Sequence, residues 1–152
     1  MIRKARIGDV KQIHTLLSYY ADKKLLLGRS ISSIYDHLRD FVVFDDNGGT
    51  ISGVCALNIC WENLAEIRSL AVTEEKTGTG IGATLVQTCL AEASEFGINR
   101  IFTLTYQPGF FRKQGFHDID KRDLPHKIWS DCINCTMFPD CDEEALMYEA
   151  EG

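Results

Sequence analysis

Three glycines alternate with small or apolar residues in the run Thr77-Gly78-Thr79-Gly80-Ile81-Gly82. A β-like segment, Glu66 to Val72, precedes the run, and an amphipathic helical pattern, Ala83 to Phe96, follows it. Glycine at such a junction lets the backbone come close to a ligand. The first N–H groups of the helix point at the same place, with the positive end of the helix dipole behind them. The run therefore predicts an anion site, most often one for a pyrophosphate.

Two common phosphate-binding motifs do not fit this run. Gly78-x-Gly80-x-x-Ala83 matches the dinucleotide fingerprint in form, but that motif places its first glycine almost directly after the strand. Here the segment Thr73 to Thr77 intervenes. The fingerprint also needs an acidic residue at the end of the next strand, which here ends Thr105-Tyr106-Gln107. A P-loop is excluded because no Gly-Lys-Ser/Thr follows the glycines.

A second group of residues with ligand chemistry is Cys132-x2-Cys135-x5-Cys141. One Cys-x-x-Cys pair, a third thiolate and a histidine, His126 or His117, would make a tetrahedral zinc site with a structural role. Free or buried thiols and a redox disulfide are the other interpretations, and the sequence leaves all three open. The remaining cysteines, which we expect in the core, are Cys55, Cys60 and Cys89.

The elements that must position these groups follow from hydrophobic periodicity and turn signals. Apolar residues at helical spacing follow Asp9, Ser30 is a candidate helix cap, and Asp45 to Gly49 is typical of a hairpin turn. We expect helices at 9–20, 30–38, 83–96 and 108–113. We expect strands at Ile2–Ile7, Phe41–Phe44, Ile51–Asn58, Leu64–Val72, Ile101–Thr105, Phe116–Asp120 and Ala145–Glu149. The order predicts a mixed α/β (α+β) fold with three consecutive antiparallel strands and a central β-loop-α-β unit.

Bulk composition limits the classes of function. The chain has 152 residues, of which 45% are hydrophobic and 25% charged, as in an ordinary globular domain. We expect one domain over residues 1–152, with a cysteine-bearing excursion at about 122–144. The formal charge of −6 argues against general binding of nucleic acid or membrane surfaces. The start Met1-Ile2-Arg3-Lys4 does not resemble a signal peptide, so we expect a cytoplasmic protein.

A family resemblance becomes visible at the glycine run. Val72-x4-Thr77-Gly78-Thr79-Gly80-Ile81-Gly82-x2-Leu85 resembles the coenzyme A pyrophosphate loop of the GCN5-related N-acetyltransferases (GNAT), whose pattern is Gln/Arg-x-x-Gly-x-Gly/Ala. Thr77 stands where that family usually has Gln or Arg. The segment Phe111 to Phe116 resembles the family's Tyr-x-x-x-Gly-Phe. The resemblance implies a twisted, mostly antiparallel central sheet of about six or seven strands flanked by helices, with acetyl-CoA as co-substrate.

The flanking segments narrow the resemblance to the acetyltransferase domain of N-acetylglutamate synthases. That resemblance implies acetylation of the α-amine of a small amino acid, most directly L-glutamate, as in the first step of arginine biosynthesis. The chain is similar to a short, stand-alone form without the amino-acid-kinase-like domain. The segments that carry the likeness are Leu27-Gly28-Arg29-Ser30, Ala65 to Val72, Phe102 to Thr105 and Lys121-x2-Leu124-Pro125-x-Lys127.

The resemblance also implies roles for single residues. Glu66 would take the proton of the ammonium group, and the N–H groups of Leu70 and Val72 would polarise the thioester carbonyl. Glu66 and Ser69 lie on opposite faces of a regular strand, so both serve one site only if a bulge intervenes. The coenzyme-binding residues that it implies are Leu70, Ala71, Val72, Thr77, Gly78, Thr79, Gly80, Ile81 and Gly82.

Substrate binding is assigned to cations. Arg29, in the position of the synthases' substrate-binding arginine, suits a bidentate carboxylate contact. Lys127 is a candidate for a second carboxylate, and Ser69 for backbone contacts. Arg112 and its neighbour Lys113 are candidates for the coenzyme phosphates, with a solvated helix face as the alternative. Phe111 replaces the tyrosine that many relatives use as a proton donor, so the thiolate leaves unprotonated or takes its proton from water.

Alternative functions remain open at this stage. A different amine acceptor, such as another amino acid, a polyamine or a protein N-terminus, is one. A non-catalytic acyl-CoA-binding sensor is another, and it should tolerate Glu66→Gln with unchanged ligand affinity. A metal-dependent regulatory module built on the three cysteines 132, 135 and 141 is the third. We expect a small amino acid and coenzyme A as partners, no nucleic acid or membrane, and a homodimer among the assemblies to test.

Overall fold

A seven-stranded sheet forms the centre of the protein in the computed structural model, in which residues 1–124 and 143–150 are described. Its strands are β1 (Ile2–Lys4), β2 (Phe41–Asp45), β3 (Ile51–Trp61), β4 (Leu64–Val72), β5 (Arg100–Thr105), β6 (His117–Ile119) and β7 (Glu144–Glu149). The spatial order is β1-β2-β3-β4-β5-β7-β6. Neighbours are antiparallel except β4 and β5, which run parallel. The predicted mixed, mostly antiparallel sheet is therefore confirmed.

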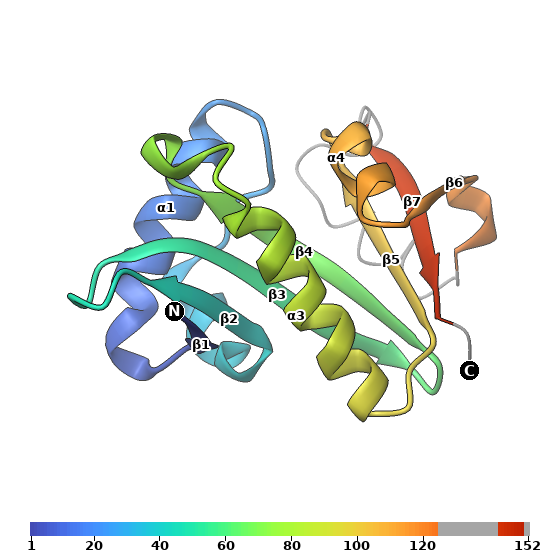
Figure 1. Ribbon diagram of the computed structural model, residues 1–152, viewed down its shortest axis with the longest axis horizontal. Helices are drawn as coiled ribbons and strands as arrows, with labels where there is room; N and C mark the ends of the chain where they lie inside the picture. The colour runs from blue at the N-terminus through green and yellow to red at the C-terminus, as the bar shows by residue number, and fades with distance from the viewer. Residues whose placement is uncertain (125–142, 151–152) are drawn as a thin grey trace.

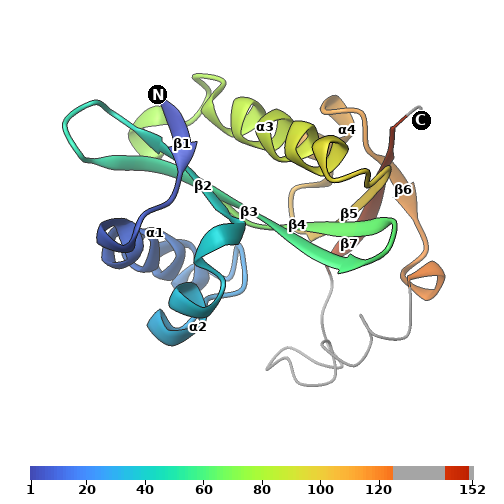
Figure 2. The same ribbon diagram turned by 90° about the horizontal axis from the view of Figure 1, so that it is seen from below.

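The helices cover both faces of this sheet. They are α1 (Val10–Asp22), α2 (Ile31–Asp36), α3 (Ile81–Glu95) and α4 (Pro108–Lys113). Seen edge-on in Figure 2, α3 lies on one side of the sheet, and α1 and α2 lie on the other. α4 lies near β6 and β7, away from α1 (Figure 1). The loop that connects β4 to α3 therefore lies between the helices of the two faces.

The apolar stripe of α1 explains its position. Val10, Ile13 and Leu17 recur at helical spacing and are fully buried. They pack in one cluster with Phe41 of β2 and Val54 of β3. Full burial of each such side chain stabilises the fold by roughly 1.5 to 3 kcal/mol. This cluster holds α1 against the N-terminal half of the sheet.

The opposite face is covered by α3. Leu85 and Cys89 are buried in one cluster with Ile67 of β4. At Gly53 on β3, an added Cβ would lie 2.9 Å from the Leu85 side chain, so glycine permits the close approach of helix and strand. The position of α3, and with it the loop at its start, is thus set by tight packing on β3 and β4.

Several predicted boundaries differ from the structure by one to three residues, and two of these differences have a clear local cause. α3 begins at Ile81 rather than at Ala83, because Gly80, with φ +88°, ends the loop and the helix starts directly after it. The first strand ends at Lys4 rather than at Ile7, because the chain turns there. The Asp9 carboxylate accepts a hydrogen bond from the Arg6 N–H at 2.8 Å and closes that turn.

Candidate functional site

The glycine run forms a sharp turn that leads into α3. Gly78 and Gly80 have φ values of +82° and +88°, which side chains with a Cβ rarely adopt. The first helical bond runs from the Thr84 N–H to the Gly80 carbonyl at 3.0 Å. The N–H groups of residues 81 to 83 therefore have no acceptor within the helix. They form the positive end of a helix of fifteen residues, as the sequence predicts.

Part of the run satisfies its own backbone. The Thr79 N–H donates to the Lys76 carbonyl at 3.3 Å, and the Thr77 N–H donates to the Glu74 carbonyl at 3.2 Å. The prediction included Thr79 among the donors to an anion, whereas the structure uses this N–H inside the turn. The N–H groups of Gly80 and Gly82, the other predicted donors, have no such bond in the described residues, and neither does the N–H group of Ile81 at the helix start.

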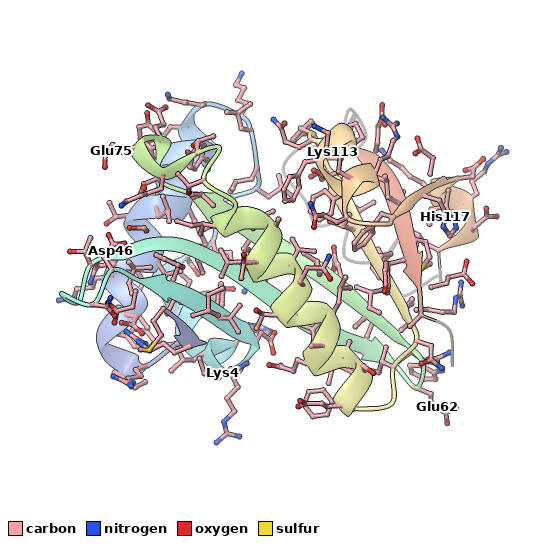
Figure 3. All side chains as sticks on the ribbon, viewed as in Figure 1. Lys4, Asp46, Glu62, Glu75, Lys113 and His117 are labelled. Atoms are coloured by element: carbon pink, nitrogen blue, oxygen red, sulfur yellow. The ribbon has the colours of Figure 1, made fainter. Side chains whose placement is uncertain are left out.

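A shallow hollow of about 340 Å³ opens beside this turn. Lys76 contributes the cationic side chain of its lining, and Gly80 lines it next to the start of α3. Figure 3 shows Glu75 at the outer edge of the same loop. The lining residues are Phe44, Lys76, Thr79, Gly80, Ile81 and Thr84.

The end of α1 anchors the segment that leads into the loop. The Tyr20 hydroxyl donates to the Val72 carbonyl at the end of β4. Tyr19 donates to the Glu74 carboxylate, and the Lys23 ammonium lies 2.8 Å from the same carboxylate. The ion pair holds the pKa of Glu74 below its ordinary value. The loop is thus tied to the helix that precedes the segment carrying Arg29.

β4 and β5 separate at the level of the site. Their parallel pairing ends at Ile67 and Thr103, although β4 continues to Val72. The Thr103 hydroxyl donates to the Ile67 carbonyl at 3.0 Å at this point. Beyond it, the ribbons of β4 and β5 diverge (Figure 1). Throughout the described ranges, the last residues of β4 have a strand partner on the β3 side alone.

A β-bulge at Ser69 changes the faces of β4. Ala56 of β3 lies opposite Arg68, but Val54, two residues away, lies opposite Ala71, so β4 carries one extra residue. Ser69 has a φ of +55°, in the left-handed region. Its place beside a predicted site follows the usual distribution of bulges. The condition under which Glu66 and Ser69 belong to one site is therefore met.

The bulge distributes the residues of β4 between the two layers. Before it, Ile67 packs on the α3 side; after it, Leu70 and Val72 pack there, while Ala71 packs against the α1 cluster. Side chains alternate along each regular stretch of a strand, so Glu66 and Arg68 point away from the face of Ile67. They therefore lie on the face where Ala71 packs after the bulge. The acidic candidate therefore faces the α1 and α2 layer, away from α3.

The backbone groups of the same stretch point toward β5. The Thr73 N–H donates to the Ser52 carbonyl of β3 at 2.8 Å. Because backbone groups alternate in direction along a strand, the N–H groups of Val72 and Leu70 point to the opposite side. The Val72 carbonyl, which accepts from Tyr20, lies on that side too. Two preorganised N–H donors thus face the region where β4 and β5 separate.

A polar cluster lies on the α2 side of the sheet. We define it by Arg29, Asp40, Asn58, Glu66 and Arg68. Arg68 Nε lies 3.4 Å from Glu66 Oε1, and the Glu66 side chain is 12% exposed. The Asn58 amide donates to Asp40 Oδ2 at 3.2 Å. In the register of β3 and β4, Asn58 lies directly opposite Glu66.

Arg29 is the most buried cation of this cluster. Its guanidinium lies 5.1 Å from the centre of the Phe41 ring, in a cation–π arrangement. Its Nη1 is buried and has no hydrogen-bond partner among the described residues. Burial and then the nearby charge of Arg68 lower the pKa of Arg29 to about 10, which leaves it charged at neutral pH. A buried, charged donor without a partner favours an anionic ligand.

Other predicted residues lie elsewhere. Arg112 forms a two-pronged ion pair with Asp118, with contacts of 2.8 and 2.7 Å, so its proposed contact with coenzyme phosphates stays a prediction. Lys113 lies at the end of α4 (Figure 3). Phe111 is buried in the core against Phe116. Lys127 and the cysteines 132, 135 and 141 lie outside the described residues.

Two negative findings concern the described ranges. Within residues 1–124 and 143–150, no three His, Cys, Asp or Glu side chains are grouped closely enough to hold a metal ion. No helix in the same ranges has the length and apolar character needed to cross a membrane. The cysteines for which zinc was one interpretation are not tested by the first finding.

The sequence analysis missed three residues of this cluster, and Arg68 is the one for which a signal was available. The available signal was a charged residue inside β4 at the alternate position from Glu66, which places both on one face. Asp40 and Asn58 carried no comparable signal. They join the cluster through the turn before β2 and the register of β3 with β4.

Comparisons with known proteins agree with this geometry. The sequence profile of the acetyltransferase (GNAT) family matches residues 11–117. An uncharacterized N-acetyltransferase of Chlorobaculum tepidum is 44% identical over 146 residues, 96% of this chain and 94% of that protein. An amino-acid acetyltransferase of Mycobacterium tuberculosis is 33% identical over 133 residues, 86% of this chain and 76% of that protein.

Two solved structures share the fold over the whole chain. Rv2747 from Mycobacterium tuberculosis, in complex with CoA and NLQ, has a TM-score of 0.85 and 28% identity, with 99% of both chains covered. N-acetylglutamate synthase from Neisseria gonorrhoeae, complexed with coenzyme A and N-acetyl-glutamate, has a TM-score of 0.90 and 25% identity. The matching region includes all of this chain and 35% of the synthase chain.

Proposed function

The chain belongs to the GNAT acetyltransferase family, and from this premise we propose that it moves the acetyl group of acetyl-CoA to the α-amine of L-glutamate. The observation that carries the proposal is the pairing of two features of β4. Its backbone N–H groups at Leu70 and Val72 face the gap toward β5, and its Glu66 belongs to a cluster with Arg29, whose Nη1 is buried without a hydrogen-bond partner among the described residues. One side offers donors to a thioester, and the other offers groups that suit an amino acid.

The start of α3 fits the diphosphate of the coenzyme. The free N–H groups at Ile81 and Gly82, at the positive end of α3, suit phosphate oxygens. An added Cβ at Gly82 would lie 3.5 Å from the Phe110 ring, in ordinary van der Waals contact. Lys76 offers a positive charge beside the same turn. The solved structures of Rv2747 and of the Neisseria synthase contain coenzyme A, which supports this placement.

Transfer requires the amine nitrogen to attack the thioester carbonyl carbon. The carbon–nitrogen bond forms, the carbon–sulfur bond breaks, and the electron pair leaves on the sulfur. We assign the N–H groups of Leu70 and Val72 to the carbonyl oxygen, where charge develops. Ser69 positions both because its left-handed conformation forms the bulge. Phe111 has no proton to donate, so the thiolate leaves as such or takes a proton from water.

Glu66 is the proposed proton acceptor. Its side chain is largely buried, on the strand that also carries the carbonyl donors. A carboxylate in this position, directly or through a water, can take the proton that the ammonium group must lose before attack. Glu66 and the bulge belong to the same strand, so their spacing is held by the register of β3 and β4.

Arg29 is the proposed partner of a substrate carboxylate. Its guanidinium is held over Phe41, and one of its nitrogens is buried without a partner in the described part of the chain. A polyamine acceptor would favour an acidic residue in place of Arg29. The names of several relatives, amino-acid acetyltransferase, support an amino-acid acceptor. Lys127 stays a candidate for a second carboxylate from the sequence alone.

A panel of acceptors tests the proposal. Thiol release from acetyl-CoA is measured with the standard amino acids and with a polyamine. We expect L-glutamate to give the highest kcat/KM, and Arg29→Ala to raise the KM for glutamate by at least tenfold. Equal rates for all acceptors would remove the substrate assignment. No turnover with any acceptor, together with binding of acetyl-CoA, would support the sensor function instead.

A further inference from the structure

Two arginines converge on the α2 side of the sheet. Arg29 comes from the segment between α1 and α2, and Arg68 comes from β4, directly before the bulge. The charge of Arg68 is one of the causes that lower the pKa of Arg29, which means that the two guanidinium groups lie within electrostatic reach of each other. Asp40 and Glu66 act in the opposite direction on Arg29, so the two arginines share their cluster with two carboxylates.

The sheet register shows what separates the two arginines. Phe41, Ala56 and Arg68 are direct neighbours across β2, β3 and β4. Arg29 lies over Phe41 at one end of this row, and Arg68 is the other end. Neighbouring strands are about 4.8 Å apart, so the row spans roughly 10 Å with only the small Ala56 in its middle. The long arginine side chains can approach an intervening ligand from both ends.

The carboxylates of the cluster leave both arginines with free donors. Glu66 contacts Arg68 through Nε at 3.4 Å, and no hydrogen bond from the Arg68 guanidinium occurs in the described residues. Asp40 accepts from Asn58. Arg29 Nη1 is buried without a hydrogen-bond partner there. Within residues 1–124 and 143–150, both guanidiniums on this face therefore keep N–H groups that no hydrogen bond uses.

We propose that Arg68 and Arg29 form a paired site for an acceptor with two carboxylates, each guanidinium binding a different one. This inference rests on the proposed function and adds the residue that binds the second carboxylate of its acceptor. A guanidinium presents parallel N–H groups that match the two oxygens of a carboxylate. An acceptor with a single carboxylate would engage one of the two guanidiniums and leave the other without a ligand oxygen for its N–H groups. Arg68 is therefore a specificity-determining residue. An acceptor with a neutral side chain has only one carboxylate, so one guanidinium of the pair would lose its contact with the acceptor.

Binding of the product and its two monoamides tests the pair without turnover. The probes are N-acetyl-L-glutamate, N-acetyl-L-glutamine and N-acetyl-L-isoglutamine, titrated by calorimetry into protein saturated with desulfo-coenzyme A. The variants are Arg68→Gln and Arg29→Gln. We expect each variant to weaken N-acetyl-L-glutamate at least tenfold. The effect of Arg68→Gln should vanish on one monoamide, and the effect of Arg29→Gln should vanish on the other.

The controls separate this pairing from a structural effect. Arg122→Gln removes an 86% exposed arginine outside the cluster and should bind all three probes like the parent protein. Arg68→Lys keeps the charge but loses the fork, so its affinity for N-acetyl-L-glutamate should fall between those of the parent and of Arg68→Gln. Thermal unfolding of each variant in the absence of probes reports any loss of fold; the Arg68 side chain is 37% exposed, so we expect little.

Two results would overturn the paired site. In one, Arg68→Gln binds N-acetyl-L-glutamate as tightly as the parent protein. In the other, Arg68→Gln weakens all three probes equally, which would mean that Arg68 recognises neither carboxylate in particular. The proposed function fails separately, by absence of glutamate turnover in the parent protein, because the binding measurements need no acetyl transfer.

Discussion

Ser69 is the residue at which the two halves of the candidate site meet. Its positive φ inserts one extra residue in β4, so that Glu66 and Arg68 face the α2 side while Leu70 and Val72 pack on the α3 side. A non-glycine residue in this conformation costs of order 1 kcal/mol or more. The surrounding pairing of β3 and β4 compensates for that cost. A strained residue next to the proposed chemistry is what a site on a bulged strand requires.

Glu66→Gln should separate proton transfer from binding. The amide keeps the shape of the side chain but cannot accept the ammonium proton, so we expect kcat to fall by about 100-fold or more. The affinity for acetyl-CoA should stay within twofold of the parent value, because the loop at α3 is unchanged. Steady-state kinetics and calorimetry measure the two quantities. Glu62→Gln, in the exposed turn after β3, is the matched control, and an equal loss of kcat there would contradict the role of Glu66.

Asp9 is expected to control stability at acid pH. Its carboxylate lies 2.7 Å from Arg3, and the hydrogen bond from Arg3 is the main cause that lowers the pKa of Asp9 in the folded protein. A lowered pKa stabilises the fold above the unfolded pKa, and the contribution is lost as pH falls through the folded pKa. Asp9→Asn should thus reduce the free energy of unfolding by about 2 kcal/mol at neutral pH.

Urea unfolding at several pH values checks this prediction. The difference between Asp9→Asn and the parent protein should shrink below about pH 4, where the carboxylate becomes protonated. Asp36→Asn, at an exposed position of α2, should show no such difference at neutral pH. A difference for Asp9→Asn that stays constant from neutral to acid pH would contradict the linkage with Arg3.

At the scale of elements, the start of α3 and the end of β4 form one unit. Tyr20 on α1 donates to the Val72 carbonyl, and Glu74 in the following turn is paired with Lys23 of the same helix. α1 therefore holds the strand end from which the loop departs. The segment after α1 carries Arg29, so the proposed acceptor and coenzyme sites share one supporting helix.

Gly80→Val should weaken coenzyme binding. A β-branched residue at φ +88° is strained by about 1 to 3 kcal/mol, and the loop must rearrange to relieve that strain. We expect the Kd for coenzyme A to rise at least tenfold, measured by calorimetry. Gly97→Val is the matched control, because Gly97 has a φ of +83° at the other end of α3 and its added Cβ also meets no neighbour. Equal losses of affinity in both variants would mean that general destabilisation is responsible.

At the scale of the whole molecule, the two faces of the sheet carry different parts of the proposed site. The α3 side contains the larger apolar cluster and the start of the helix proposed to bind phosphates. The other side contains the α1 cluster and the polar cluster proposed for the acceptor. β4 contributes side chains to both faces of the sheet, and the point where β4 and β5 separate lies between these two faces. This division lets a coenzyme and an acceptor approach one strand from different directions.

Ligand binding should therefore stabilise the entire fold. At coenzyme A concentrations 100-fold above Kd, the free energy of unfolding rises by about 2.7 kcal/mol. For a chain of this length, that corresponds to a rise in Tm of roughly 5 to 10 °C, measured by calorimetric unfolding. Gly80→Val should show a smaller rise than Gly97→Val at one fixed concentration of coenzyme A. A parent Tm that does not change with coenzyme A would contradict the proposed phosphate site.

The order of strands and helices and the glycine turn were determined by the sequence alone, and the family resemblance named Glu66 as a candidate. These features depend on local patterns, because helix periodicity, caps and turn residues act over a few positions. The resemblance of the glycine run to the coenzyme loop is also local. The predicted and observed ends of an element differ by a few residues where the backbone conformation of one residue sets the end, as the positive φ of Gly80 does for the start of α3.

Only the tertiary structure decided which of these groups share a site. The bulge at Ser69 follows from the pairing of β4 with β3, the nearness of Arg68 to Arg29 follows from the packing of the α1–α2 segment over β2, and Arg112 is drawn to Asp118. Each of these depends on contacts between residues far apart in the chain or on competition for one partner. Short-range propensity carries no information about such contacts, because their free energy exists only once the sheet has formed.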